Sequence, residues 1–185
     1  MKYSIDAILE KILSLENELA DGTDEFIIGL IDKSLNLSVL PAFLNNITTI
    51  YKNTFQGCKN LALTELPPNL TSIGEYAFNG CEKITLTKLP DSLTDIEYSA
   101  FSSCDGLVSI ILPKSLVNMG GYIFAWCENL ETVTFKGTPT TIPYSIFYQC
   151  TNLTTINVPW AEGEVANAPW GATNATINYN YTATE

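Results

Sequence analysis

The sequence contains no arginine and no histidine among its 185 residues, so its nine basic residues are all lysines. Arginine is the side chain best suited to bidentate contacts with phosphate. The twenty carboxylates give a net charge of −11, which repels nucleic acid. Histidine is the usual general base for serine and cysteine nucleophiles. We therefore expect no nucleic-acid partner and no enzymatic activity, and we assign no catalytic residue.

Long apolar runs are also missing. No segment reaches the roughly 18 apolar residues that a membrane-spanning helix needs. The first 20 residues carry four carboxylates where an export signal would be continuously apolar. The sequence has no glycine-rich phosphate loop and no C-x-x-C pair that could begin a metal site. We expect no membrane insertion, no metal and no cofactor.

The cysteines that are present follow a strict period. Each lies 23 residues from the next, and each follows a phenylalanine by three residues. The pairs are Phe55 and Cys58, Phe78 and Cys81, Phe101 and Cys104, Phe124 and Cys127, and Phe147 and Cys150. Five registers without a slip predict a solenoid of stacked units. Equivalent thiols in such a stack point the same way, so we interpret them as small buried apolar residues and not as disulfides.

Other positions recur with the same period and give approximately L-x-x-I-x-L-P-x-S-L-x-x-I-x-x-x-A-F-x-x-C. This pattern, from about Leu40 to Pro159, resembles the BspA-like leucine-rich repeats. The resemblance implies a right-handed repeat solenoid of 23-residue units. Stretches such as residues 107–112 alternate and predict a parallel β-sheet on one face, and the Phe-x-x-Cys spacing predicts short helical or 3₁₀ turns on the other.

Two units depart from the pattern. Thr64 and Thr87 occupy the place of the inward isoleucine, and Leu63 and Leu86 come one residue early. Either a bulge turns the leucines inward or two threonines are buried, and we favour the bulge because a buried hydroxyl needs a partner.

The N-terminus predicts an amphipathic helix over residues 1–22. Its apolar seam is spaced 3, 4, 3, 4 and consists of Ile5, Ile8, Ile12, Leu15 and Leu19. Isoleucine at both seam positions favours three or four strands over two, so the helix predicts a homotrimer. The alternative is that the helix packs on its own solenoid and seals the first turn.

The ends of the stack differ from its middle. We divide the chain into the helix (1–22), a degenerate capping unit (23–50), a five-unit solenoid (51–158) and a C-terminal cap (159–185). In the cap, Ile177, Tyr179 and Tyr181 alternate and predict one last strand that covers the open end. The tryptophan-rich tail, residues 159–163 and 168–172, resembles the ending of leucine-rich repeat proteins encoded by phages and prophages.

Two sets of side chains are candidates for binding. The outward positions of the predicted strands are Glu65, Lys88, Ile111, Thr132, Thr134, Thr155 and Asn157. The second set is an aromatic patch of Tyr122, Trp126, Tyr144 and Tyr148. Exposed aromatics could stack on sugars or anchor a protein. The alternative is that these rings fill gaps between turns.

The resemblances imply a non-enzymatic, virion-associated fibre, tail or head-decoration protein whose repeat surface contacts a host surface protein or glycan. A bacterial cell-surface adhesin is one alternative, which the repeat family implies. An intracellular scaffold for protein–protein contacts is another, since it suits reduced cysteines and needs no export signal.

Overall fold

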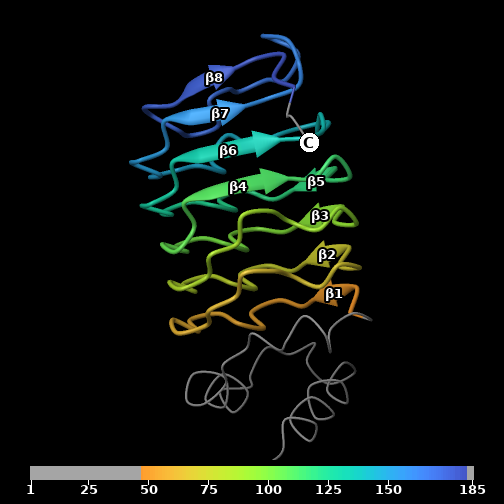
Figure 1. The fold of residues 1–185 in the computed structure, drawn as a ribbon, viewed down its shortest axis with the longest axis vertical. Coiled ribbons are helices and arrows are strands. Elements are labelled where there is room, and N and C mark those ends of the chain that lie inside the picture. The colour runs from red at the N-terminus through yellow and green to blue at the C-terminus, as the bar shows by residue number, and fades with distance from the viewer. Residues whose placement is uncertain (1–46, 183–185) are drawn as a thin grey trace, which may run out of the picture.

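The computed structural model describes residues 47–182, and these form a stack of similar chain turns, one above the next (Figure 1). The repeat solenoid predicted from the 23-residue period is therefore confirmed. The predicted N-terminal helix and most of the predicted capping unit lie outside the described residues.

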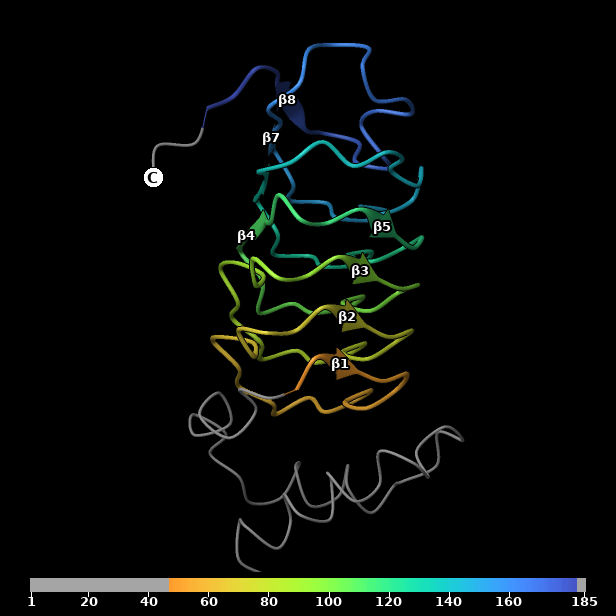
Figure 2. The same ribbon diagram turned by 90° about the vertical axis from the view of Figure 1, so that its right-hand side faces the viewer.

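The stack carries two parallel β-sheets of four strands each. The first sheet contains β1 (Thr49–Ile50), β2 (Ser72–Ile73), β3 (Asp95–Ile96) and β5 (Asn118–Met119). The second contains β4 (Ser109–Leu112), β6 (Thr132–Phe135), β7 (Thr155–Asn157) and β8 (Thr176–Asn178). The two sheets lie on different faces of the stack (Figure 2). The prediction of a sheet on one face only is wrong, because strands of two residues are too short to show alternation in the sequence.

The second sheet is interrupted in the early turns. Leu63 and Leu86 are buried, and Thr64 and Thr87 are exposed, so the predicted inward rotation of the leucines is confirmed. The predicted strands over these stretches do not form, apart from one isolated bridge between Lys88 and Ile111. Two successive outward residues between buried leucines break the alternation that a strand requires.

The corner that holds each Phe-x-x-Cys motif is built from tight turns. Ala77 N donates to Gly74 O at 3.2 Å, and Cys81 N donates to Phe78 O at 3.1 Å. The third residue of each of these turns has a left-handed φ, 55° at Tyr76 and 73° at Gly80. A left-handed residue cannot continue a helix. The prediction of a helical or 3₁₀ segment here is wrong, and residues 47–182 contain no helix.

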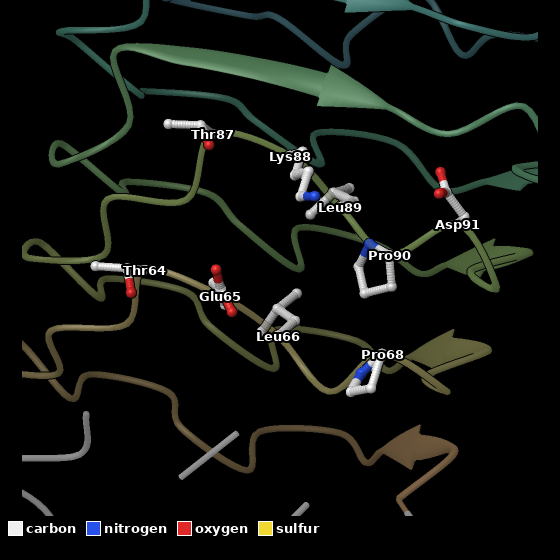
Figure 3. Close-up of a pocket in the computed structure, with 9 residues that line it drawn as sticks. All are labelled: Thr64, Glu65, Leu66, Pro68, Thr87, Lys88, Leu89, Pro90 and Asp91. Atoms are coloured by element: carbon white, nitrogen blue, oxygen red, sulfur yellow. The ribbon is translucent and has the colours of Figure 1, made fainter. Parts of the chain in front are cut away.

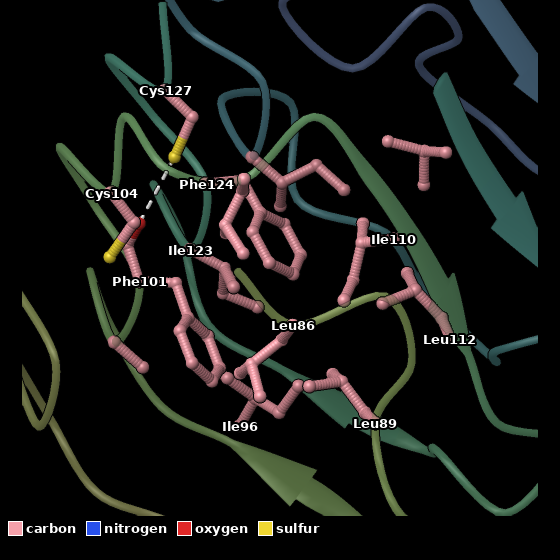
Figure 4. Packing of buried hydrophobic residues seen from close by; sticks show 14 of the residues in the cluster. Leu86, Leu89, Ile96, Phe101, Cys104, Ile110, Leu112, Ile123, Phe124 and Cys127 are labelled. Atoms are coloured by element: carbon pink, nitrogen blue, oxygen red, sulfur yellow. Dashed lines mark hydrogen bonds between the residues drawn. The ribbon is translucent and has the colours of Figure 1, made fainter. Parts of the chain in front are cut away.

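The core is a column of phenylalanine rings beside a column of thiols (Figure 4). The rings stack with centroids 5.1–6.2 Å apart and planes within 18° of parallel. Each thiol after the first donates to a phenylalanine carbonyl of the preceding turn, as from Cys127 Sγ to Phe101 O at 3.1 Å. All five cysteines are buried and none forms a disulfide, which confirms their interpretation as small core residues.

The C-terminal end of the stack is covered by two tryptophans. Trp160 and Trp170 are buried, and both rings contact the ring of Phe135. Trp170 Nε1 donates to Ala166 O at 2.8 Å, which satisfies its only polar atom. The predicted last strand forms as β8, which extends the second sheet beside β7. The buried cover is made by the tryptophans and not by the aromatics of the strand.

Candidate binding surfaces

The outward positions of the second sheet are only partly exposed. Glu65 and Lys88 are exposed, Ile111, Thr132 and Thr155 are half-buried, and Thr134 and Asn157 are buried at 9% and 6% exposure. Asn157 Nδ2 donates to Thr134 Oγ1 at 3.1 Å, and Asn178 Nδ2 donates to Asn157 Oδ1 at 2.8 Å. The expectation that Thr134 and Asn157 face solvent is wrong, because a strand beyond the repeats engages them in an internal ladder.

Glu65 and Lys88 lie in a notch where the second sheet is interrupted (Figure 3). The notch has a volume of about 270 Å³. Its lining consists of Thr64, Glu65, Leu66, Pro68, Thr87, Lys88, Leu89, Pro90 and Asp91. No backbone hydrogen bond joins residues 64–68 to residues 87–91. The notch is therefore a gap in the ladder, lined by hydroxyls and by charges of both signs.

A continuous line of aromatic rings runs across the turns at another corner. We call it the aromatic strip, and it consists of Tyr76, Tyr98, Tyr122, Trp126 and Tyr148. Neighbouring rings have centroids 5.4–5.8 Å apart. Tyr98, Trp126 and Tyr148 are 41%, 42% and 39% exposed. The rings therefore support one another while each of these three offers part of its surface to a ligand.

The strip unites three of the four predicted aromatic residues and adds two that were not predicted. Tyr144 is 69% exposed and lies outside this line of ring contacts. Tyr76 and Tyr98 were missed, although a sequence signal existed. Tyr76 occupies the repeat position of Tyr122, and Tyr98 occupies that of Tyr144, each 46 residues earlier. Aligning the units column by column would have found both.

Several rings of the strip are attached to strained backbone. Trp126 and Tyr122 have φ values of 57° and 56°. The repeat position of Trp126 is occupied in earlier turns by Gly57 and Gly80, which adopt this conformation without a Cβ clash. A left-handed φ costs an L-residue about 1–2 kcal/mol relative to the right-handed region. The same position holds Ser103 and Gln149 in other turns, also at left-handed φ, so the conformation belongs to the corner of every repeat and tryptophan is one of several residues that the corner accepts.

Residues 47–182 hold no group of three or more cysteine, aspartate or glutamate side chains that could hold a metal ion. Burial raises the pKa of the Cys150 thiol to about 12 and raises the pKa of Cys104 and Cys127 well above the usual value. These thiols stay protonated near neutral pH and are poor nucleophiles.

No helix within residues 47–182 has the length and apolar character needed to cross a membrane.

Short parallel strands, tight corners and a leucine-rich interior repeated every 23 residues define the molecule as a leucine-rich repeat solenoid. A family model of the BspA type leucine-rich repeat region matches residues 43–167 in six copies. The chain therefore belongs to the BspA-type leucine-rich repeat family.

Solved structures show the same fold. A leucine-rich repeat protein from T. pallidum matches with a TM-score of 0.54 and 27% sequence identity, over 73% of this chain and 64% of that one. The present chain thus spans less than two thirds of the treponemal chain. The pneumococcal vaccine antigen PcpA matches with a TM-score of 0.52 and 23% identity, over 63% of this chain and 31% of that one, and this likeness concerns the fold alone. No curated protein matches the chain.

Proposed function

We propose that the chain is a non-enzymatic recognition protein that presents the aromatic strip to a partner on a host surface. Leucine-rich repeat solenoids are extended surfaces suited to binding. The observation that carries the proposal is the line of partly exposed aromatic rings, above all Trp126 at a position where the other turns have glycine, serine or glutamine. Tryptophan and tyrosine are the side chains that most often dominate binding energy.

We propose first that the protein acts on a phage particle, as a fibre, tail or head-decoration protein. Its support is the resemblance of the tryptophan-rich tail to phage- and prophage-encoded repeat proteins. In this arrangement the helix predicted from the sequence of residues 1–22 joins three copies or docks the solenoid on another virion protein. Three copies would give each particle several strips, which raises avidity without new contacts.

A bacterial cell-surface adhesin is the second candidate, and membership of the BspA-type family favours it. An antibody raised against the solenoid separates the two. It should label purified phage particles in the first case and intact producing cells in the second. Labelling of neither, with all of the protein inside the cells, would overturn both and support an intracellular scaffold.

The oligomeric state is tested by measuring mass in solution for the full chain and for a chain without residues 1–22. We expect a trimer that becomes a monomer when the seam from Ile5 to Leu19 is removed. A full-length monomer would rule out the trimeric fibre.

The binding role of the strip is tested by host-cell binding of Trp126→Ala. We expect at least about a tenfold loss of affinity, as for a binding hot spot. The matched control is Tyr181→Ala, which removes an aromatic ring of similar exposure, 38%, beyond β8 and outside the strip. If the Trp126→Ala variant binds host cells as strongly as the Tyr181→Ala variant, the strip has no role in recognition.

A further inference from the structure

The aromatic strip is continuous with a polar groove on the outer face of the first sheet. The groove has a volume of about 450 Å³ and includes Tyr98, which also belongs to the strip. Its full lining is Ser72, Asp95, Ile96, Glu97, Tyr98, Asn118, Met119, Gly120 and Thr141. The strands β2, β3 and β5 lie one above the next in successive turns (Figure 2). The groove that they line therefore extends along the stack. A chain-like ligand could therefore contact both surfaces at once.

The floor of the groove presents one polar side chain per turn. Ser72, Asp95, Asn118 and Thr141 are spaced by 23 residues. Ser72 pairs with Asp95, and Asp95 pairs with Asn118, in the parallel register of the sheet. Equivalent residues in such a register point to the same face. The groove thus offers a regular row of hydroxyl, carboxylate and amide groups.

Hydrogen bonds hold the central members of this row in place. Asn118 Nδ2 donates to one carboxylate oxygen of Asp95, and Thr94 Oγ1 donates to the other. A carboxylate oxygen has two acceptor positions, so each oxygen of Asp95 keeps one for a ligand. A polar group fixed before binding loses less conformational entropy when the ligand arrives.

Charge narrows the class of ligand. Asp95 and Glu97 line the groove, and no lysine does. The whole chain has a net charge of −11. An anionic ligand would be repelled, whereas hydroxyl groups can donate to the carboxylates without opposing charge. Tyr98 in the groove and Trp126 farther along the strip are aromatic side chains that are 41% and 42% exposed. Sugars carry both features, hydroxyl groups around the ring edge and C–H groups on its faces.

We propose that the groove and the strip together bind an uncharged glycan chain. Sugar rings pack on the aromatic strip while their hydroxyl groups bond to Asp95 and Asn118. This inference rests on the proposed recognition function and names the ligand of the same surface. A protein partner would use the rings of the strip but would not need the polar row.

The probes are defined polysaccharides without charge, namely glucans, mannans and galactans, beside anionic alginate and a sulfated glycan. Titration calorimetry and tryptophan fluorescence of the full chain report binding. We expect at least one neutral polysaccharide to bind, and Asn118→Ala and Trp126→Ala each to weaken it about tenfold or more. The control, Asn152→Ala, removes an exposed asparagine that does not line the groove. A single cooperative thermal transition well above the assay temperature shows for each variant that the stack is intact.

Failure of the glycan inference can be told from failure of the recognition function. If no neutral polysaccharide binds, if only the anionic ones bind, or if Asn118→Ala binds as the parent does, the glycan inference is overturned. Should host binding nevertheless depend on Trp126 and vanish after protease treatment of the host, the partner is a protein and the recognition function stands. Should the chain bind no host surface at all, both are overturned.

Discussion

Two lines of aromatic rings run along this molecule, the buried phenylalanine column and the exposed aromatic strip. Their ring spacings are similar, 5.1–6.2 Å inside and 5.4–5.8 Å outside. The inner rings come from a single repeat position and lie within 18° of parallel. The outer rings come from four repeat positions and meet at angles from 14° to 80°.

The difference shows which constraint acts on each line. A buried ring touches the same neighbours in every turn, so close packing forces one residue type and one orientation. An exposed ring meets solvent on one side and is free of that constraint. The outer line nevertheless keeps aromatic residues, including Trp126 at a corner position that other turns fill with glycine, serine or glutamine, so the repeat fold does not require a ring there. The regular inner line of rings is set by the fold, whereas the irregular outer line is the candidate binding site.

The largest expected effect concerns the thiols beside the phenylalanine column. Burial raises the pKa of Cys81, Cys104, Cys127 and Cys150 from a usual value of 9.0. The unfolded chain therefore loses these protons first, so stability is fully present below pH 9 and falls as pH rises above it. Each thiol should remove up to about 1.4 kcal/mol per pH unit. Urea unfolding between pH 8 and 10.5 measures the loss.

The control for the alkaline loss is Cys127→Ala, which removes one thiol from the ladder. Its stability is lower at neutral pH but should fall with pH less steeply than that of the parent, by about 1.4 kcal/mol per pH unit. Equal slopes for the two proteins would show that other groups cause the alkaline unfolding.

Next in size is the loss of one inner ring. Phe101→Ala should lower the free energy of unfolding by about 3–5 kcal/mol, because it leaves a cavity between two stacked rings. Trp126→Ala, in the outer line, should lower it by about 1–3 kcal/mol, since that partly exposed ring loses two ring contacts and leaves no buried cavity. Equal losses in urea unfolding would mean that the outer line is core, and the contrast between the two lines would fail.

A smaller effect is expected where one turn approaches the next beneath the strip. A Cβ at Gly120 would lie 2.5 Å from Tyr98 N and 2.6 Å from Glu97 C, and neither backbone atom can move freely. Gly120→Ala should cost about 1–3 kcal/mol. The matched control is the adjacent Gly121→Ala, whose Cβ would meet nothing closer than 3.5 Å. Thermal unfolding of the two variants measures this difference. Similar melting temperatures would contradict the close contact between the two turns at Gly120.

The smallest change in stability is expected for Trp126→Gly. Glycine relieves about 1–2 kcal/mol of left-handed strain, while the lost contacts with Tyr122 and Tyr148 cost about 0.5–1.5 kcal/mol each. The two effects nearly cancel, so unfolding should change by about 1 kcal/mol or less. Host binding should nevertheless be lost. A Trp126→Gly variant that is much less stable would show that the ring supports the fold. A variant that still binds the host would show that the ring is not part of the binding site.

Much of the fold could be predicted because the buried positions repeat. The phenylalanine and cysteine columns indicate the solenoid, the buried corners and the register directly. The first sheet could not be predicted, because strands such as Ser72–Ile73 are too short to leave a periodic pattern. The tight corners depend on residues with a left-handed φ, such as Tyr76, and the residue type does not indicate this conformation.

The candidate site was predicted less well, because exposure depends on residues outside the repeat. Thr134 and Asn157 are buried in a side-chain ladder that β8 extends with Asn178, a contact from beyond the repeats. Only part of the aromatic strip could be predicted, because Trp126 and Tyr148 are recognisable in the sequence as bulky residues of the same corner. Tyr98 was missed because it lies one repeat position away from Tyr122, and the two meet only once the turns are stacked.

The buried pair Trp160 and Trp170 has a consequence for assembly. The turns below are alike, so an uncovered last turn would present an apolar face and free strand edges that fit the next copy. Such faces would associate copies end to end. We expect the tryptophan cap, by covering that face, to keep the stack from associating in this way. A chain ending at Val158 should scatter light increasingly with concentration, and one that stays disperse would deny the cap this role.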